Sequence, residues 1–153
     1  MSNSEWKSEL TEFFEDIQII EKCKKQTLED FEQLCEFIAE PAFENLSEEL
    51  KRQKIKSRFK KNKKKSIDFQ INFPGSRLDH FHYTIFLPKN SVQLKLTLHI
   101  RGRKNKESQL ENKEMPFMEG VQPSDLLRMP KEKIIQDVID HYKAFVYETI
   151  AVP

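Results

Sequence analysis

The sequence predicts an α+β fold in which a three-stranded antiparallel β-meander has N-terminal helices and a C-terminal helix packed on its apolar face. Apolar residues recur at helical spacing near both ends of the chain, whereas they alternate with polar residues in the middle. A length of 153 residues suits one domain with a substantial core. We therefore expect a single α+β domain over residues 1–153.

The N-terminal part, residues 1–50, is expected to be helical and acidic. Apolar residues recur every three or four positions from Trp6 to Ile20, which is typical of an amphipathic helix. Thr27, with Asp30 three positions later, has the spacing of a capping box and predicts the start of a second helix.

Pro41 is expected to break or restart the second helix, because proline lacks the backbone donor that a helix interior needs. Ser47 is a good N-cap for a third helix, which has acidic residues in its first turn and basic residues toward its end. Residues 51–65 are therefore predicted to be a basic helix end followed by a solvated linker.

Residues 66–102 change to a period of two, in which apolar side chains alternate with polar ones. This pattern predicts half-buried strands of an antiparallel meander with one apolar and one polar face. The expected strands are 67–73, 81–87 and 92–101, and the turns between them fall at Pro74-Gly75-Ser76 and at Lys89-Asn90.

Beyond the meander, residues 103–129 read as an irregular loop. Pro130 suits the first turn of a final helix over 130–150, whose apolar stripe runs from Ile134 to Val146. The order of one helical part, three strands and a helix resembles that of double-stranded-RNA-binding domains. The final helix here begins Pro130-Lys131-Glu132-Lys133, which contains an acid, and no residue role is transferred.

Charge is strongly segregated along the chain. Residues 1–50 carry 14 acidic and 4 basic side chains, whereas ten of the fifteen residues in 51–65 are Lys or Arg and none is acidic. Basic side chains at this density neutralise phosphates, so the leading prediction is a non-catalytic protein that binds a polyanion, above all nucleic acid. The residues predicted to bind are Arg52, Arg58, Lys60, Lys61, Lys63, Lys64, Lys65, Arg101 and Arg103.

An alternative follows from the same charges. The acidic helices and the basic run have net charges of −10 and +10, so they can pair with each other within one chain or between subunits. In that case the protein is an interaction or self-assembling module, with a homo-oligomer or another protein as its partner. Plain solubility is the third interpretation of such a run.

The polar side of the predicted sheet carries a candidate ligand face made of His80, His82 and His99. A two-residue turn at Lys89-Asn90 would place His80 opposite His99, and a four-residue turn would place His82 there instead. Three histidines on one surface can bind zinc, a small molecule or bases. The leading interpretation nevertheless includes no metal and no cofactor.

Several classes are disfavoured by composition. Only three glycines are present and none are clustered, which argues against phosphate-cradling glycine loops. Cys23 and Cys35 lack paired metal-binding spacing and suggest reduced thiols, so we expect a cytoplasmic protein. No apolar run is long enough for a membrane span, and no residue set predicts an enzyme.

Overall fold

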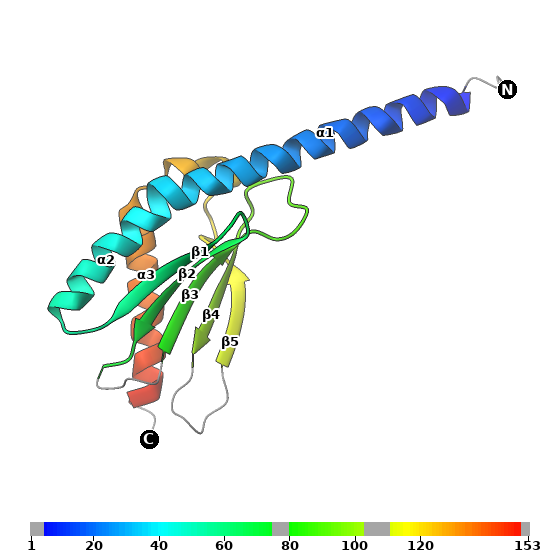
Figure 1. Cartoon of the computed structure of the whole chain (residues 1–153). Coiled ribbons are helices and arrows are strands. Elements are labelled where there is room, and N and C mark those ends of the chain that lie inside the picture. Colours follow the sequence, from blue (N-terminus) through cyan, green and yellow to red (C-terminus); the bar gives the residue numbers. More distant parts are fainter. Residues whose placement is uncertain (1–4, 75–79, 103–110, 151–153) are drawn as a thin grey trace.

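The computed structural model describes residues 5–74, 80–102 and 111–150. They form an antiparallel sheet with helices on one side (Figure 1). In chain order the elements are α1 (Glu5–Leu34), the π-helical turn η1 (Cys35–Ala39), α2 (Glu40–Arg52), β1 (Ser57–Asn62), β2 (Ser66–Asn72), β3 (His80–Phe86), β4 (Thr97–Gly102), β5 (Glu111–Pro116), the 3₁₀ helix η2 (Pro123–Arg128) and α3 (Lys131–Ile150). The predicted α+β class and antiparallel sheet are confirmed.

The prediction of three strands was wrong, because the sheet has five strands in the order β1-β2-β3-β4-β5. Strand β5 lies in the segment predicted to be an irregular loop, and β1 lies in the basic run. Within that run Ile55, Ser57 and Phe59 are partly buried, and the basic residues between them are exposed. The charges are tolerated because β1 is an edge strand, where lysine also discourages pairing with another sheet.

The turn between α2 and β1 is a Schellman motif. The amide of Ile55 donates to the carbonyl of Leu50 at 2.9 Å, and the amide of Lys54 donates to that of Lys51 at 3.0 Å. Lys54 occupies the left-handed position of this motif with φ of +62°, where glycine is usual. The chain therefore leaves the helix sharply and enters β1 within a few residues.

Two hydroxyl residues predicted to begin helices lie inside helices instead. Thr27 is buried within α1, and its hydroxyl donates to the carbonyl of Cys23 at 2.8 Å. Ser47 lies within α2, and its hydroxyl is 2.7 Å from that of Ser57 on β1. Both N-cap predictions were wrong, because Ser and Thr hydroxyls inside a helix can also form hydrogen bonds with the preceding turn or with a neighbouring element.

Pro41 restarts the helix, which is one of the two outcomes predicted for it. It lies at the start of α2, directly after the π-helical turn Cys35–Ala39. A π turn shifts the hydrogen-bond pattern by one residue, which accommodates a residue without an amide donor. Helices α1 and α2 therefore follow one another with little separation (Figure 1).

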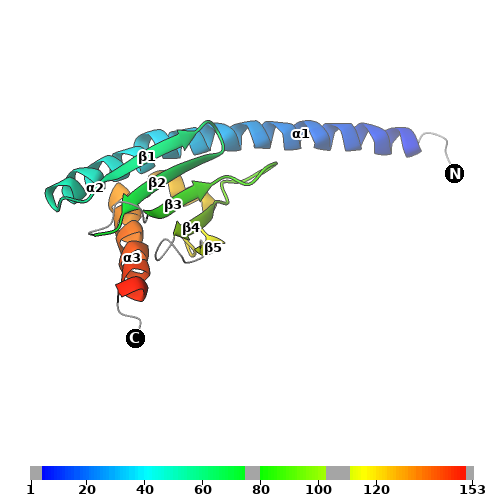
Figure 2. The ribbon, with the colours of Figure 1, turned by 60° about the horizontal axis from the view of Figure 1, so that its bottom comes forward.

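The helices pack on one face of the sheet, and Figure 2 shows α2 and α3 on the same side of the strands. Phe43 of α2 is fully buried, and its ring centroid is 4.6 Å from that of Phe69 and 6.2 Å from that of Tyr83. Tyr142 of α3 packs edge-on against Phe81 at 5.4 Å. The opposite face of the sheet is not covered by any described helix.

The first half of α1 does not take part in this packing. It extends away from the sheet (Figure 1), and Trp6, Phe13 and Phe14 are each more than half exposed. Burial in α1 begins at Thr27. This differs from the expectation that the N-terminal helices as a whole cover the sheet.

The two cysteines are expected to differ in reactivity, because Cys23 is exposed and Cys35 is buried. Burial raises the pKa of the Cys35 thiol to about 12, opposed by the nearby Lys61 charge. A thiol reagent at pH 8 should therefore modify Cys23 rapidly and Cys35 only after unfolding. Mass spectrometry of the native protein checks this, and rapid labelling of both would show that the η1 core is not packed as described.

Candidate polyanion-binding surface

The open face of the sheet carries a row of side chains that crosses all five strands. Strand pairing places Arg58, Gln70, His82, Arg101 and Asn112 next to one another in that order. We call this set the arginine row. It contains no carboxylate, and its two guanidinium-bearing residues are three strand spacings apart, about 14 Å.

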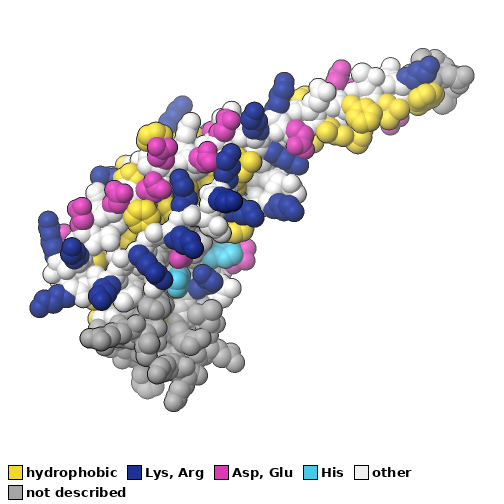
Figure 3. Space-filling model, in the orientation of Figure 1, with side chains coloured by type: hydrophobic (Ala, Val, Ile, Leu, Met, Phe, Trp, Pro, Cys, Tyr) yellow, Lys and Arg dark blue, Asp and Glu magenta, His cyan; other side chains and the backbone are white. Residues whose placement is uncertain are grey.

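A second row on the same face is mixed in charge. It runs through Lys60, Asp68, Thr84, His99 and Glu114. The His99 Nε2 atom lies 3.7 Å from a Glu114 carboxylate oxygen. The carboxylates make this part of the face less attractive to an anion than the arginine row. Figure 3 shows basic side chains gathered around histidines on the face turned toward the viewer.

Asp68 connects the two rows. Its carboxylate accepts a hydrogen bond from the Thr84 hydroxyl at 2.6 Å and lies 3.1 Å from the Nδ1 atom of His82. Partial burial alone would raise the pKa of Asp68, but hydrogen bonds from His82 and Thr84 and the Arg101 charge lower it below its ordinary value. Asp68 is therefore ionised at neutral pH and holds the His82 ring in place.

The predicted histidine pairings were wrong. His99 lies opposite Thr84, and His82 lies opposite Arg101. The reason is the connection between β3 and β4, which occupies residues 87–96 instead of a short turn. His80 pairs with Asn72 in the backbone register, but its side chain lies outside the described residues. The described part of the chain holds no group of three or more side chains suited to a metal ion.

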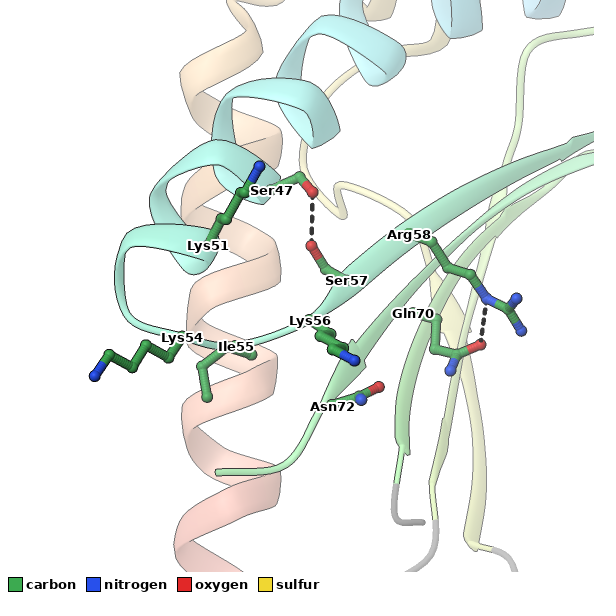
Figure 4. A pocket seen from close by; sticks show the side chains of 9 residues that line it. All are labelled: Ser47, Lys51, Lys54, Ile55, Lys56, Ser57, Arg58, Gln70 and Asn72. Atoms are coloured by element: carbon green, nitrogen blue, oxygen red, sulfur yellow. Dashed lines mark hydrogen bonds between the residues drawn. The ribbon is translucent and has the colours of Figure 1, made fainter. Parts of the chain in front are cut away.

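A cleft adjoins the arginine row at the β1 edge of the sheet. It has a volume of about 770 Å³ and lies between the end of α2 and the first residues of β1 and the last of β2 (Figure 4). We call it the β1 cleft. Its lining contains four basic side chains and no carboxylate: Ser47, Lys51, Lys54, Ile55, Lys56, Ser57, Arg58, Gln70 and Asn72.

Arg58 joins the cleft to the arginine row. Its Nε atom donates to the Gln70 side-chain oxygen at 3.2 Å, and in Figure 4 the guanidinium points away from α2. Lys56 lies beside Asn72, and the backbone N–H of Asn72 donates a hydrogen bond to the backbone carbonyl of Lys56 at 3.0 Å. The β1 cleft, which has no carboxylate in its lining, thus continues into the arginine row, where Asp68 lies beside Gln70 and His82.

The structure separates the basic residues that the sequence grouped together. Lys61 lies 3.6 Å from Glu40, Lys64 lies 3.9 Å from Glu32, and Arg52 lies 3.0 Å from Glu49. These three are partly neutralised by the acidic helices. Exposed ion pairs of this kind contribute little to stability, but they reduce the net charge offered to a ligand.

The other predicted residues lie in two further places. Lys60 is on the open face beside Asp68, and Arg101 is in the arginine row. Lys63 and Lys65 lie in the turn between β1 and β2, at the opposite end of β1 from the cleft. Arg103 lies outside the described residues.

Sequence reasoning missed Lys51, Lys54 and Lys56 as cleft residues, although they belong to the basic run. A strand pattern is present in Ile55–Lys60, where partly buried and exposed residues alternate. Only two of those residues are large and apolar, so the dense charge concealed the alternation. A strand there would have placed Lys56, Arg58 and Lys60 on one face.

Replacing Asp68 with asparagine is expected to raise the affinity for a polyanion about fivefold, because two unit charges about 4 Å apart interact by ~1 kcal/mol in water. The substitution keeps the shape of the side chain and removes the negative charge beside the arginine row. Fluorescence anisotropy with a labelled oligonucleotide measures the change. An unchanged or lower affinity would place the ligand away from this face.

None of the described helices is long and apolar enough to cross a membrane. No protein-family model matches the chain, and comparison with curated proteins and with solved structures found no match to either.

Proposed function

We propose that this protein is a non-catalytic binding protein that contacts nucleic acid through the β1 cleft and the arginine row. The observation that carries the proposal is the composition of the β1 cleft. Lys51, Lys54, Lys56 and Arg58 line it with no carboxylate among the lining residues, in a chain whose net charge is only +1.

Each part of this surface has a chemical role in the proposal. The cleft cations contact backbone phosphates, which supply affinity without sequence information. Beyond Arg58, the side chains of Gln70, His82 and Asn112 offer hydrogen-bonding groups to sugars and base edges. These side chains add a modest base preference to binding that is largely independent of sequence.

The turn that ends α2 brings Lys54 to the cleft. Lys54 occupies the left-handed position of the Schellman motif, so its side chain joins those of Lys51 and Lys56 in the cleft lining. The ion pairs Lys61–Glu40 and Lys64–Glu32 account for a different part of the basic run by pairing with the acidic helices.

Salt dependence tests the proposal in the wild-type protein. Five cations line the cleft and the row, and each phosphate contacted on a single strand lowers log K by about 0.7 per log unit of salt, which gives a slope of roughly −3.5. Anisotropy titrations of labelled single- and double-stranded oligonucleotides, with nuclease-treated protein, measure this slope. An absence of binding even at low salt would refute the proposed function.

A further inference from the structure

The exposed half of α1 carries an apolar stripe that no described residue covers. Trp6, Leu10, Phe13, Ile17 and Ile20 follow one another at alternating intervals of four and three residues. Four of them are between 43% and 55% exposed, and Ile17 is partly exposed. Figure 3 shows hydrophobic side chains gathered along one edge of the projecting part of α1.

The same spacing continues into the folded body. Thr27, Phe31, Leu34 and Ile38 extend the intervals of four and three, and all of them are buried. One seam therefore runs along the helix, and its second half is covered by the chain's own core. Alternation of four and three is the pattern of a coiled-coil seam, so the first half has the spacing that fits another helix.

We propose that this half of α1 pairs with the same segment of a second copy of the chain, in antiparallel orientation. The distribution of charge along α1 favours a second copy of the chain as the partner and the antiparallel direction for the pairing. Residues 5–16 carry five acidic and one basic side chain, whereas residues 17–25 carry three basic and one acidic. Antiparallel pairing places each acidic half against the basic half of the other copy, and parallel pairing would place like charges together.

A register centred near Glu15 pairs the apolar residues of the stripe in one copy with those of the other. It places Phe13 against Ile17 of the second copy and Leu10 against Ile20, and Trp6 then falls beside Lys24 of the second copy. In the flanking positions Lys7 comes opposite Glu21. Each half-exposed aromatic or branched side chain offers on the order of 100 Å², so the five residues of the stripe bury roughly 500 Å² per copy, or about 1,000 Å² in total, at the small end of specific interfaces.

A second cleft extends the seam where α1 meets the body. It has a volume of about 470 Å³ and is lined by Lys24, Leu28, Lys64, Lys65 and residues 86–91. The proposed register brings Trp6 of the second copy to the mouth of this cleft. The apolar tip of α1 therefore meets a cleft whose lining includes Leu28, Phe86 and Leu87.

Sedimentation equilibrium tests the pairing without any nucleic acid, so its outcome is independent of the proposed function. The wild-type protein should be a dimer, and Phe13→Glu should raise the dissociation constant at least 100-fold. Ile19→Glu is the matched control, because Ile19 is 59% exposed but lies on the other side of the helix. It should leave the dimer intact.

Circular dichroism should show that both variants remain folded, because Phe13 and Ile19 are both more than half exposed. Phe13→Glu should lose only the stabilisation that dimerisation adds. A wild-type monomer at all concentrations would overturn the proposal, as would equal dimerisation of wild type and Phe13→Glu. Binding of a monomeric wild type to lipid vesicles of mixed phosphatidylcholine and phosphatidylserine would also overturn it, by assigning the stripe to a membrane surface.

Cross-linking tests the antiparallel direction. In the proposed register Glu9 lies close to Cys23 of the second copy, and Cys35 is buried. A short bis-maleimide should therefore link Glu9→Cys into covalent dimers and leave the wild type, which has Cys23 alone on its surface, uncoupled. Efficient linking of the wild type through Cys23 to Cys23 would show parallel pairing and contradict the proposed arrangement.

Discussion

Replacing Lys54, Lys56 and Arg58 together with alanine is expected to weaken single-strand binding roughly 100-fold at about 0.1 M salt, because each lost phosphate contact removes about 0.7 log unit under these conditions. The slope of log K against log salt should become shallower by about 2 for a single strand. All three side chains line the β1 cleft. Fluorescence anisotropy over a series of salt concentrations measures both quantities.

The matched control is Lys61→Ala with Lys64→Ala, which removes two charges that pair with Glu40 and Glu32. It should weaken binding less than fivefold, since those lysines are already partly neutralised. Circular dichroism should show that both variants are folded. Equal losses of affinity per charge removed would mean that total charge, and not the β1 cleft, determines binding.

The second large effect concerns stability. Phe43 is 0% exposed and contacts Phe69 and Tyr83 on the sheet, so Phe43→Ala should lower the free energy of unfolding by about 3–5 kcal/mol. The substitution leaves a cavity between α2 and the sheet. Urea unfolding monitored by circular dichroism measures the loss.

Phe37→Ala is the control for Phe43, because it makes the same chemical change at a side chain that is 68% exposed. Its effect should stay within about 0.5 kcal/mol, as for other surface substitutions. If the two variants lost similar amounts, the packing of α2 against the sheet would not be the main source of stability. The ratio of the two losses therefore measures how much α2 contributes to the core.

Strands β2 and β3 could be predicted from the sequence because apolar and polar residues alternate along them without interruption. Ile67, Phe69 and Ile71 on β2, and Phe81, Tyr83 and Ile85 on β3, are all buried. Burial of one face forces a period of two on the sequence. The same reasoning failed for β1, because an edge strand packs on only one neighbour and its alternation can be weak.

Register could not be predicted, because it depends on the lengths of the connections. The contact between Asp68 and His82 requires Gln70 to lie opposite His82, and nothing in the local pattern fixes that pairing. A loop longer or shorter by two residues would keep every side chain on the same face of the sheet but would place a different residue opposite it on the neighbouring strand. The site residues were therefore identified by face but not by partner.

The extent of the core could not be predicted either. Phe13 and Phe31 have the same apolar character and belong to the same seam of α1, yet Phe13 is 54% exposed and Phe31 is 0% exposed. Periodicity reports which side of a helix is apolar. It does not report where along the helix the covering elements end.

Amide chemical shifts of the isotope-labelled protein, followed during titration with a short single-stranded oligonucleotide, test the proposed binding surface most directly. The largest changes should fall on Lys54, Lys56 and Arg58 in the β1 cleft and continue through Gln70 and Arg101 in the arginine row. Changes confined to the turn at residues 63–65, or an absence of any change at low salt, would contradict the assignment of this surface to nucleic acid.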